Sequence, residues 1–342
     1  DLAFFMIIPG NNPDSGGYRT LLKYIKLLND HNYSVDLYFG SCWNDKHVNM
    51  NVYQLNNYGI PKCSNWFNPK INHIQLLINN IKKYNVLDID KNNYYIGFKC
   101  QRDYEIIVAN AWQTAEAVYQ NKKSTKKIYY IIQDREELFY PNNATMQNNV
   151  IKTYKNEFNY YCITQYLFKY FKDTYNCKNI ISSHMGVNLN IYKKYNNIRE
   201  ESVIIPYYKS FKPGRKPRLV EKIIDILSTN NIKCYIYPYD YTNNNNNNII
   251  NLGVLTECDL NKLYNKYKVG IVFSNTNPSR LGFEMYASGL QVIEYDSEFT
   301  KYDMPNEYFT KIKDEKNIVS IVKKLFNKPY DNYFLQNIDM NY

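Results

Sequence analysis

The chain has 342 residues, more than one compact core usually holds and about right for two domains of roughly 150 residues each. Its hydrophobic content of 44% is typical of globular cores and excludes wholesale disorder. The formal net charge of +10 favours binding of an anionic partner but does not identify that partner. Codons rich in A and T also explain the many Lys and Asn residues and the 37 tyrosines.

The seven cysteines are odd in number, widely spaced and without a Cys-x-x-Cys pair. This pattern argues against a disulfide framework or a structural zinc site, so we expect reduced thiols and a cytoplasmic location, in the host cytoplasm if the protein is viral. No apolar run approaches the ~18 to 20 residues that cross a bilayer. Because the chain begins at Asp1 rather than Met, we expect it to be a domain of something longer.

Apolar runs of strand length alternate with helical periodicity, which predicts parallel α/β sheets. In the first half, strands are expected at 3–8, 35–39, 105–109, 128–132 and 160–163, and helices around 21–28, 74–81, 114–119 and 166–171. In the second half, strands are expected at 202–207, 234–237, 269–273 and from 292, and helices at 219–227, 260–264 and 318–325. The Asn-rich run 243–248 is expected in a surface loop.

These elements predict an α/β fold class with two Rossmann-like domains facing each other across a cleft. We place the first domain at residues 1–195 and the second at 196–342, with the last helix packing back on the first domain. Ligands of open parallel sheets bind beyond the carboxyl ends of the strands, so the loops after the strands are the candidate sites.

Two adjacent glycines, Gly16 and Gly17, follow the first expected strand. Paired glycines let the backbone approach a ligand closely, and the following helix start offers N–H groups to an anion. The spacing matches neither Gly-x-Gly-x-x-Gly nor a Gly-Lys-Thr phosphate loop. We expect a glycine loop lining the ligand site; a tight strand–helix turn is the alternative.

A basic segment follows the first strand of the second half and includes Lys209, Arg215 and Lys216. Arg can bracket two phosphate oxygens at once and Lys adds a compact charge, so a diphosphate is the expected ligand. The alternative is a solvated basic turn.

Residues 274–289 join an apolar strand to the next one through a Ser- and Pro-rich loop and a short helix containing Glu284. A Glu at the start of such a helix can accept two hydroxyl hydrogen bonds, as from a ribose, and its charge suits the positive end of the helix. An ordinary Glu at a helix start is the alternative.

Two further segments, around Trp112 and Thr114 and around Asp134 and Glu136, follow strands of the first half. A Trp beside polar groups forms an amphipathic platform for a sugar ring, and the two acids could accept sugar hydroxyls or serve as a base. An Asp-capped helix or a solvated acidic loop would explain them equally simply.

Taken together, the segments resemble glycosyltransferases of the two-domain GT-B type, within the retaining family 4 and more narrowly the bacterial WsaF-type rhamnosyltransferases. The resemblance rests on residues 109–115, on 133–136 with 139–141, and on Pro278 and Ser279 with 284–289. It runs in order from Gly16 to about Ile293.

The resemblance implies a role for each matching residue. The donor-binding residues would be Lys209, Arg215, Lys216, Ser279, Arg280 and Glu284, the last holding the ribose. The glycine loop would be Gly16 and Gly17, the acceptor side Trp112 and Thr114, and the catalytic acids Asp134 and Glu136. Many family members carry a Glu, seven intervening residues and a second Glu; here Thr276 occupies the first position. The substitution removes the family's usual contact to the donor sugar, which agrees with the rhamnosyl branch or with lost activity.

The predicted function is transfer of a hexose, or a deoxyhexose such as rhamnose, from a UDP- or dTDP-linked donor to a glycan or glycoprotein hydroxyl, with retention. The expected partners are that donor and acceptor; no cofactor, no metal and no specific nucleic acid are expected, since the four His residues form no ligand pattern. Two alternatives stay open: a degenerate transferase-like scaffold, and a basic protein that binds nucleic acid or polysaccharide.

Overall fold

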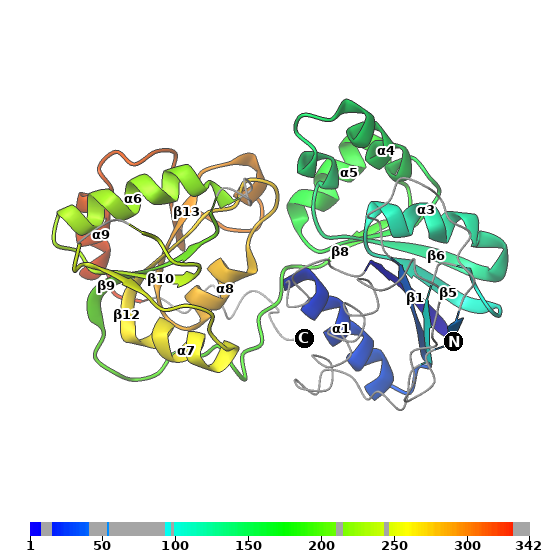
Figure 1. Ribbon diagram of the computed structural model, residues 1–342, viewed down its shortest axis with the longest axis horizontal. Coiled ribbons are helices and arrows are strands. Elements are labelled where there is room, and N and C mark those ends of the chain that lie inside the picture. The colour runs from blue at the N-terminus through cyan, green and yellow to red at the C-terminus, as the bar shows by residue number, and fades with distance from the viewer. Residues whose placement is uncertain are drawn as a thin grey trace. The chain divides into compact units, whose positions relative to one another are not determined.

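The computed structural model describes residues 1–7, 16–40, 53–54, 93–96, 99–209, 215–242 and 246–330 (Figure 1). The chain forms two compact units. The first comprises Asp1–Cys162 and Tyr170–Ile181, and the second comprises Ile163–Lys169 and the chain from Ser182 onward. The division expected at residue 195 therefore lies within the second unit, and the helix expected at 74–81 lies outside the described residues.

The first unit is built on a sheet of eight described strands in the order β3-β4-β2-β1-β5-β6-β7-β8. Its strands are β1 (Leu2–Ile7), β2 (Val35–Gly40), β3 (Tyr53–Gln54), β4 (Asn93–Ile96), β5 (Tyr104–Ala109), β6 (Thr125–Ile132), β7 (Asn159–Cys162) and β8 (Ile180–Ser182). Its helices are α1 (Gly16–Asp30), α3 (Trp112–Gln120), η2 (Lys122–Ser124), η3 (Glu136–Phe139) and α4 (Ala144–Tyr154), together with the end of α5 (Gln165–Tyr175), whose first residues belong to the second unit. From β4 through β1 to β7 the strands pair in parallel, while β3 pairs antiparallel with β4.

Strand β1 is the central strand of this unit, with β2 on one side and β5 on the other. Its apolar run is buried on both faces, as expected for a parallel sheet covered by helices. Because parallel crossovers are right-handed, the helices that follow β1 and β5, α1 and α3, cover opposite faces (Figure 1).

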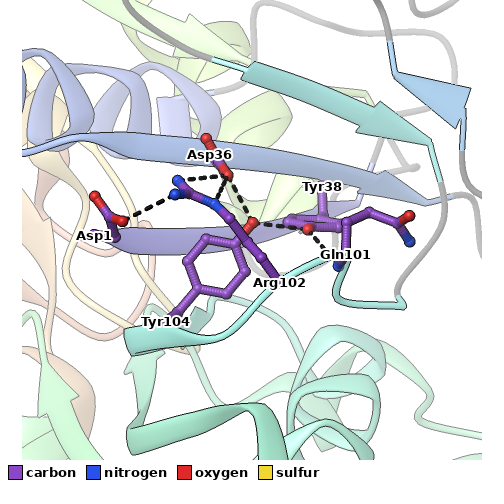
Figure 2. Close-up of polar contacts among 6 residues, drawn as sticks. All are labelled: Asp1, Asp36, Tyr38, Gln101, Arg102 and Tyr104. Atoms are coloured by element: carbon purple, nitrogen blue, oxygen red, sulfur yellow. Dashed lines mark hydrogen bonds and ion pairs between the residues drawn. The ribbon is translucent and has the colours of Figure 1, made fainter.

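A polar cluster joins the amino-terminal ends of these strands, at the edge opposite the loops that follow them (Figure 2). Asp36 on β2 is fully buried and accepts hydrogen bonds from Arg102 Nε at 3.0 Å and from the Tyr104 hydroxyl at 2.6 Å. The Tyr104 hydroxyl is also 2.8 Å from that of Tyr38, and Arg102 reaches Asp1 at 2.9 Å. The cluster satisfies a buried carboxylate and fastens β2, β5 and the start of the chain together.

The second unit contains a sheet of six described strands in the order β11-β10-β9-β12-β13-β14, and each strand pairs in parallel with its neighbours. Its strands are β9 (Glu200–Tyr207), β10 (Cys234–Pro238), β11 (Ile249–Asn251), β12 (Tyr267–Val272), β13 (Gln291–Tyr295) and β14 (Phe309–Ile312). Its helices are α6 (Pro217–Thr229), α7 (Glu257–Lys266), α8 (Arg280–Ala287), η5 (Glu298–Thr300) and α9 (Ile318–Phe326).

Helices cover both faces of this sheet (Figure 1). On one face, apolar side chains of α6 and α9, including Ile223, Leu227 and Val322, share a buried core with alternate residues of β9 and β12. On the other face, α8 lies so close to β12 that a Cβ at Gly270 would stand 2.6 Å from the sulfur of Met285. The last described helix, α9, thus packs into the core of the second unit.

Both units are Rossmann-like α/β domains, as the alternation of apolar runs and helical periods predicted. In the described parts of the chain, no helix has the length and apolar character needed to cross a membrane.

Candidate functional site

The strand order of the second unit reverses between β9 and β12. The chain leaves β9 towards β10 through α6, and leaves β12 towards β13 through α8. The loops after β9 and β12 therefore diverge to opposite faces, and the carboxyl edge between them is where open α/β sheets bind ligands.

Arg215 and Lys216 end the loop after β9 and reach across the sheet edge. Arg215 Nη1 donates to the carbonyl of Phe273, which directly follows β12, over 3.5 Å. Lys216, in a left-handed conformation before α6, places Nζ 4.3 Å from the ring centroid of Tyr295 at the end of β13. Two positive side chains thus lie over the ends of β12 and β13. Lys209 is exposed two residues beyond β9, and residues 210–214 lie outside the described chain.

Glu294, a fully buried residue of β13, binds the loop between β12 and α8 through hydrogen bonds. Glu294 accepts hydrogen bonds from the Ser274 amide (2.7 Å), the Ser274 hydroxyl (2.8 Å) and the Tyr295 amide (2.7 Å). Ser274 Oγ in turn accepts the amide of Ser279 over 2.9 Å. Ser279 is buried and directly precedes α8, and Arg280 is the first residue of that helix.

Burial raises the pKa of Glu294 to about 7. The Tyr295 amide, Lys311, the Ser274 hydroxyl and Arg215 act in the opposite direction and favour the carboxylate. Lys311 is the register partner of Glu294 on β14. Burial lowers the pKa of its ammonium group to about 8, although nearby carboxylates favour the charged form.

Glu284 lies in the middle of α8 and is only 7% exposed. Its charge acts on Tyr237 of β10 and on Tyr264 of α7, whose hydroxyls are 2.6 Å apart. Burial is the main reason that the pKa of both tyrosines lies well above the ordinary value, and Glu284 and Tyr208 add to it. Tyr208 directly follows β9 and adjoins Lys209, so Glu284 and a residue beside the basic loop act on the same two tyrosines.

In the first unit, the corresponding switch lies between β1 and β5. Gly16 and Gly17 are the first residues of α1, which follows β1; residues 8–15 lie outside the described chain. Trp112 is the first residue of α3, after β5. Asn110 Nδ2 donates to the carbonyl of Phe5 over 3.0 Å, which joins the ends of β5 and β1.

Glu136 anchors the start of α3. It is 6% exposed and accepts the Trp112 amide at 2.9 Å and the Tyr130 hydroxyl at 3.1 Å. The Trp112 indole N–H donates to the Tyr140 hydroxyl at 3.2 Å, and the two rings meet edge to face. Burial raises the pKa of Glu136 to about 8. These contacts fix the orientation of the half-buried indole ring of Trp112.

The two predicted acids have different surroundings. Asp134 is partly exposed, and its Oδ1 accepts the amide of Arg135 over 2.8 Å. Arg135 bonds Glu137 at 2.7 Å and stacks over the Tyr170 ring at 3.9 Å. Asp134 therefore stands at the surface of a segment whose neighbouring acids are buried.

Thr114 is fully buried at the start of α3. Its hydroxyl accepts the amides of Asn110 and Ala111, each at 3.0 Å, and donates to the Ala111 carbonyl at 2.8 Å. The structure thus gives Thr114 a capping role at the helix start, which saturates the hydroxyl that was expected to face an acceptor.

Arg215, Lys216 and Ser279 lie at the carboxyl edge of the second sheet, while Glu284 lies within α8 rather than at the helix start where it was expected. Sequence reasoning missed Glu294 and Lys311, although a signal exists: each is the only charged residue of its strand.

No protein-family model matches this chain, and no curated protein matches it by sequence. Solved structures match over nearly the whole chain. Sucrose-phosphate synthase from Thermosynechococcus elongatus is 12% identical, over 96% of this chain and 90% of its own, with a TM-score of 0.64. HepE from Anabaena in complex with UDP is 10% identical over 95% and 90%, with a TM-score of 0.61. A glycosyltransferase from Rickettsia africae ESF-5 is 14% identical over 99% and 89%, with a TM-score of 0.55.

The chain has the GT-B fold. At these identities the likeness concerns the fold, and the two Rossmann-like domains predicted for a GT-B protein are confirmed. In this GT-B chain, the site residues described above lie in loops that follow strands and in the helices and strands next to those loops.

Proposed function

We propose that this chain is a glycosyltransferase that moves a hexose or deoxyhexose from a nucleoside diphosphate sugar to a glycan hydroxyl. One observation carries the proposal: Arg215 and Lys216 lie at the same carboxyl edge of the second sheet as Ser279, and Glu284 lies in the helix that Ser279 precedes. The arrangement offers cations for a diphosphate and a carboxylate for a ribose, on either side of the β9–β12 switch point.

The chemistry required of the donor site is stabilisation of negative charge. When the glycosidic bond to the donor breaks, charge builds on the leaving diphosphate, and Arg215 and Lys216 would be positioned to stabilise it. Removing one such contact costs on the order of 10²-fold in rate. With the charge met by side chains, we propose a metal-independent transfer. Retention follows if the acceptor attacks from the face that the diphosphate leaves, without an enzyme nucleophile.

The donor is proposed to be UDP- or dTDP-linked. HepE is described with UDP, with UDP and glucose, and with UDP-glucose, which supports a uridine nucleotide. Thr276 stands at the position of the first Glu, which contacts the donor sugar in many family 4 enzymes, so we favour a deoxyhexose such as rhamnose, which offers fewer hydroxyls to bind.

On the acceptor side, we assign Trp112 the apolar contact with a sugar ring, since Glu136 and Tyr140 hold its indole in place. Asp134 is the acid with an exposed edge and is proposed to contact the acceptor hydroxyl. Glu136, being buried and fully bonded, is proposed to act through Trp112 rather than on the substrate.

The test is calorimetric binding of a panel of UDP- and dTDP-sugars in the presence of EDTA, with Arg215→Ala and Glu284→Gln beside the parent. We expect the parent to bind one nucleotide class and each variant to bind it at least tenfold more weakly, because charged hydrogen bonds contribute roughly 1.5 to 3 kcal/mol. Lys233→Ala is the matched control: this exposed lysine precedes β10, at the opposite edge of the same sheet.

The proposal fails if no nucleotide binds, or if the parent and the two site variants bind alike. Binding without transfer or hydrolysis of any donor would instead identify a degenerate scaffold. Steeply salt-dependent retention on DNA, without nucleotide binding, would identify the basic binding protein.

A further inference from the structure

Glu294 is an unusual residue for its position. It lies at the end of a strand whose other residues are apolar or amide, is fully buried, and takes three hydrogen bonds from two residues. An apolar side chain would fill this space without the cost of burying a carboxylate. Stability of the sheet alone therefore does not explain a Glu here.

Glu294 binds the beginning of the loop between β12 and α8, residues 273–279, which we call the donor loop. Both polar groups of Ser274, its amide and its hydroxyl, bond the carboxylate. The same hydroxyl accepts the Ser279 amide, and the Ser279 carbonyl accepts the Gly282 amide in the first turn of α8. An unbroken chain of hydrogen bonds thus runs from β13 through the loop into the helix that carries Glu284.

The charges around Glu294 come from three elements. Lys311 faces it from β14 and Arg215 faces it from the segment before α6. Lys311 Nζ is buried and has no hydrogen-bond partner among the described residues, and Asp296 and Asp303 also act on it. One of the cations assigned to the diphosphate, Arg215, is therefore electrostatically coupled to Glu294.

We propose that Glu294 is a positioning residue of the donor site, which holds Ser274 so that the loop and α8 keep the arrangement that binds a nucleoside diphosphate. The inference rests on the proposed function and deepens it. Glu294 itself does not touch the nucleotide; it acts through Ser274, Ser279 and α8.

The inference predicts a pH dependence. Charge-assisted hydrogen bonds are stronger than neutral ones, so the loop is held best when Glu294 is ionised. Since burial raises the pKa of Glu294 to about 7, the carboxylate is lost as the pH falls through neutrality. Glu294→Gln keeps the shape and is neutral at every pH.

The experiment measures the dissociation constant of UDP by calorimetry for the parent and Glu294→Gln, from about pH 5.5 to about pH 8.5. The terminal phosphate of UDP titrates at about pH 6 whichever protein it binds. The ratio of the two dissociation constants therefore reports the effect of residue 294. We expect the parent to bind roughly tenfold more tightly than Glu294→Gln above pH 8, and both to bind alike below about pH 6.

A second pair of variants guards against misfolding of Glu294→Gln. Ser274→Ala removes the hydroxyl that links Glu294 to Ser279 and should weaken UDP binding roughly tenfold. Ser228→Ala is its matched control: the hydroxyl of that buried serine donates to the Asp225 carbonyl within the same helix, α6, so its removal should leave UDP binding unchanged.

A ratio of constants that does not change with pH overturns the inference, as does unchanged binding by Ser274→Ala. Tighter binding by Glu294→Gln above pH 8 also overturns it, because repulsion of the diphosphate would then outweigh positioning. If the parent itself binds neither UDP nor dTDP at any pH, the proposed function fails first.

Discussion

The buried carboxyl group of Glu136 makes the stability of the first unit depend on pH. Glu136 lies under the start of α3, 6% exposed, with the Trp112 amide and the Tyr130 hydroxyl as its donors. Glu136→Gln removes the charge and preserves the shape of the side chain. Any change in stability with pH that the substitution abolishes then belongs to this carboxyl group.

Burial is the main cause that raises the pKa of Glu136 from its ordinary value of 4.5 to about 8. The folded chain therefore binds this proton more readily than the unfolded chain, and the free energy of unfolding falls as the pH rises from about 4.5 to about 8. A pKa difference of this size corresponds to at most roughly 5 kcal/mol by pH 9. We expect Glu136→Gln to gain a few kcal/mol over the parent between pH 5 and pH 9, by roughly the same linkage.

Hydrogen exchange followed by mass spectrometry suits this test, because peptides within residues 104–132 report on the first unit alone. Comparing variant and parent at the same pH cancels the intrinsic dependence of exchange on pH. Glu105→Gln is the matched control: Glu105 is exposed on β5 and pairs with Lys126 at 2.7 Å. A difference in protection between Glu136→Gln and the parent that stays constant from pH 5 to pH 9 would refute the reasoning.

Two further predictions concern stability. Tyr104→Phe removes the hydroxyl that bonds the buried Asp36, so the first unit should lose about 1–3 kcal/mol in urea unfolding, whereas Tyr33→Phe, on an exposed ring, should lose almost nothing; equal losses would contradict the role of the cluster. Gly289→Ala, at φ +92° and with Arg199 Nη2 2.6 Å from the added Cβ, should cost the second unit about 1–3 kcal/mol more than Gly253→Ala, which has φ +68° and open space around it. Equal melting temperatures for the two alanine variants would contradict this prediction, because they would show that the Arg199 side chain moves away from the added Cβ at no cost.

The parts of the fold that were predictable from the sequence are those with strong local patterns. The apolar runs that became β1, β9 and β12 are buried on both faces, so they read clearly as strands of a covered parallel sheet. The short strands β11 and β14 and the polar helix α4 were missed, because a strand of three or four residues and a largely polar helix carry only a weak apolar pattern.

The limits of the two units were less predictable for a related reason. Residues Ile163–Lys169 belong to the second unit, although the chain on both sides of them belongs to the first. The amides of Gln165 and Tyr166 donate to Asp303 at 2.8 and 3.0 Å, contacts across more than a hundred residues of sequence. A division of the chain at a single point cannot describe such an arrangement.

The candidate site divides in the same way. The position of Arg215 at the carboxyl edge could be predicted, because topology assigns the loops after parallel strands to that edge. Glu294 could not be assigned its partner from the sequence, because Ser274 lies on another strand's loop and only the sheet register brings them together. Thr114 lies in a segment that the sequence singled out, but its hydroxyl forms its hydrogen bonds with the backbone at the start of its own helix.

The most direct test of the donor site is a crystal structure of the chain with UDP. The account predicts the diphosphate within hydrogen-bond distance of Arg215 or Lys216, and a ribose hydroxyl bonded to the carboxylate of Glu284. UDP bound elsewhere, or bound at this edge with Glu284 turned away from the ribose, would contradict it.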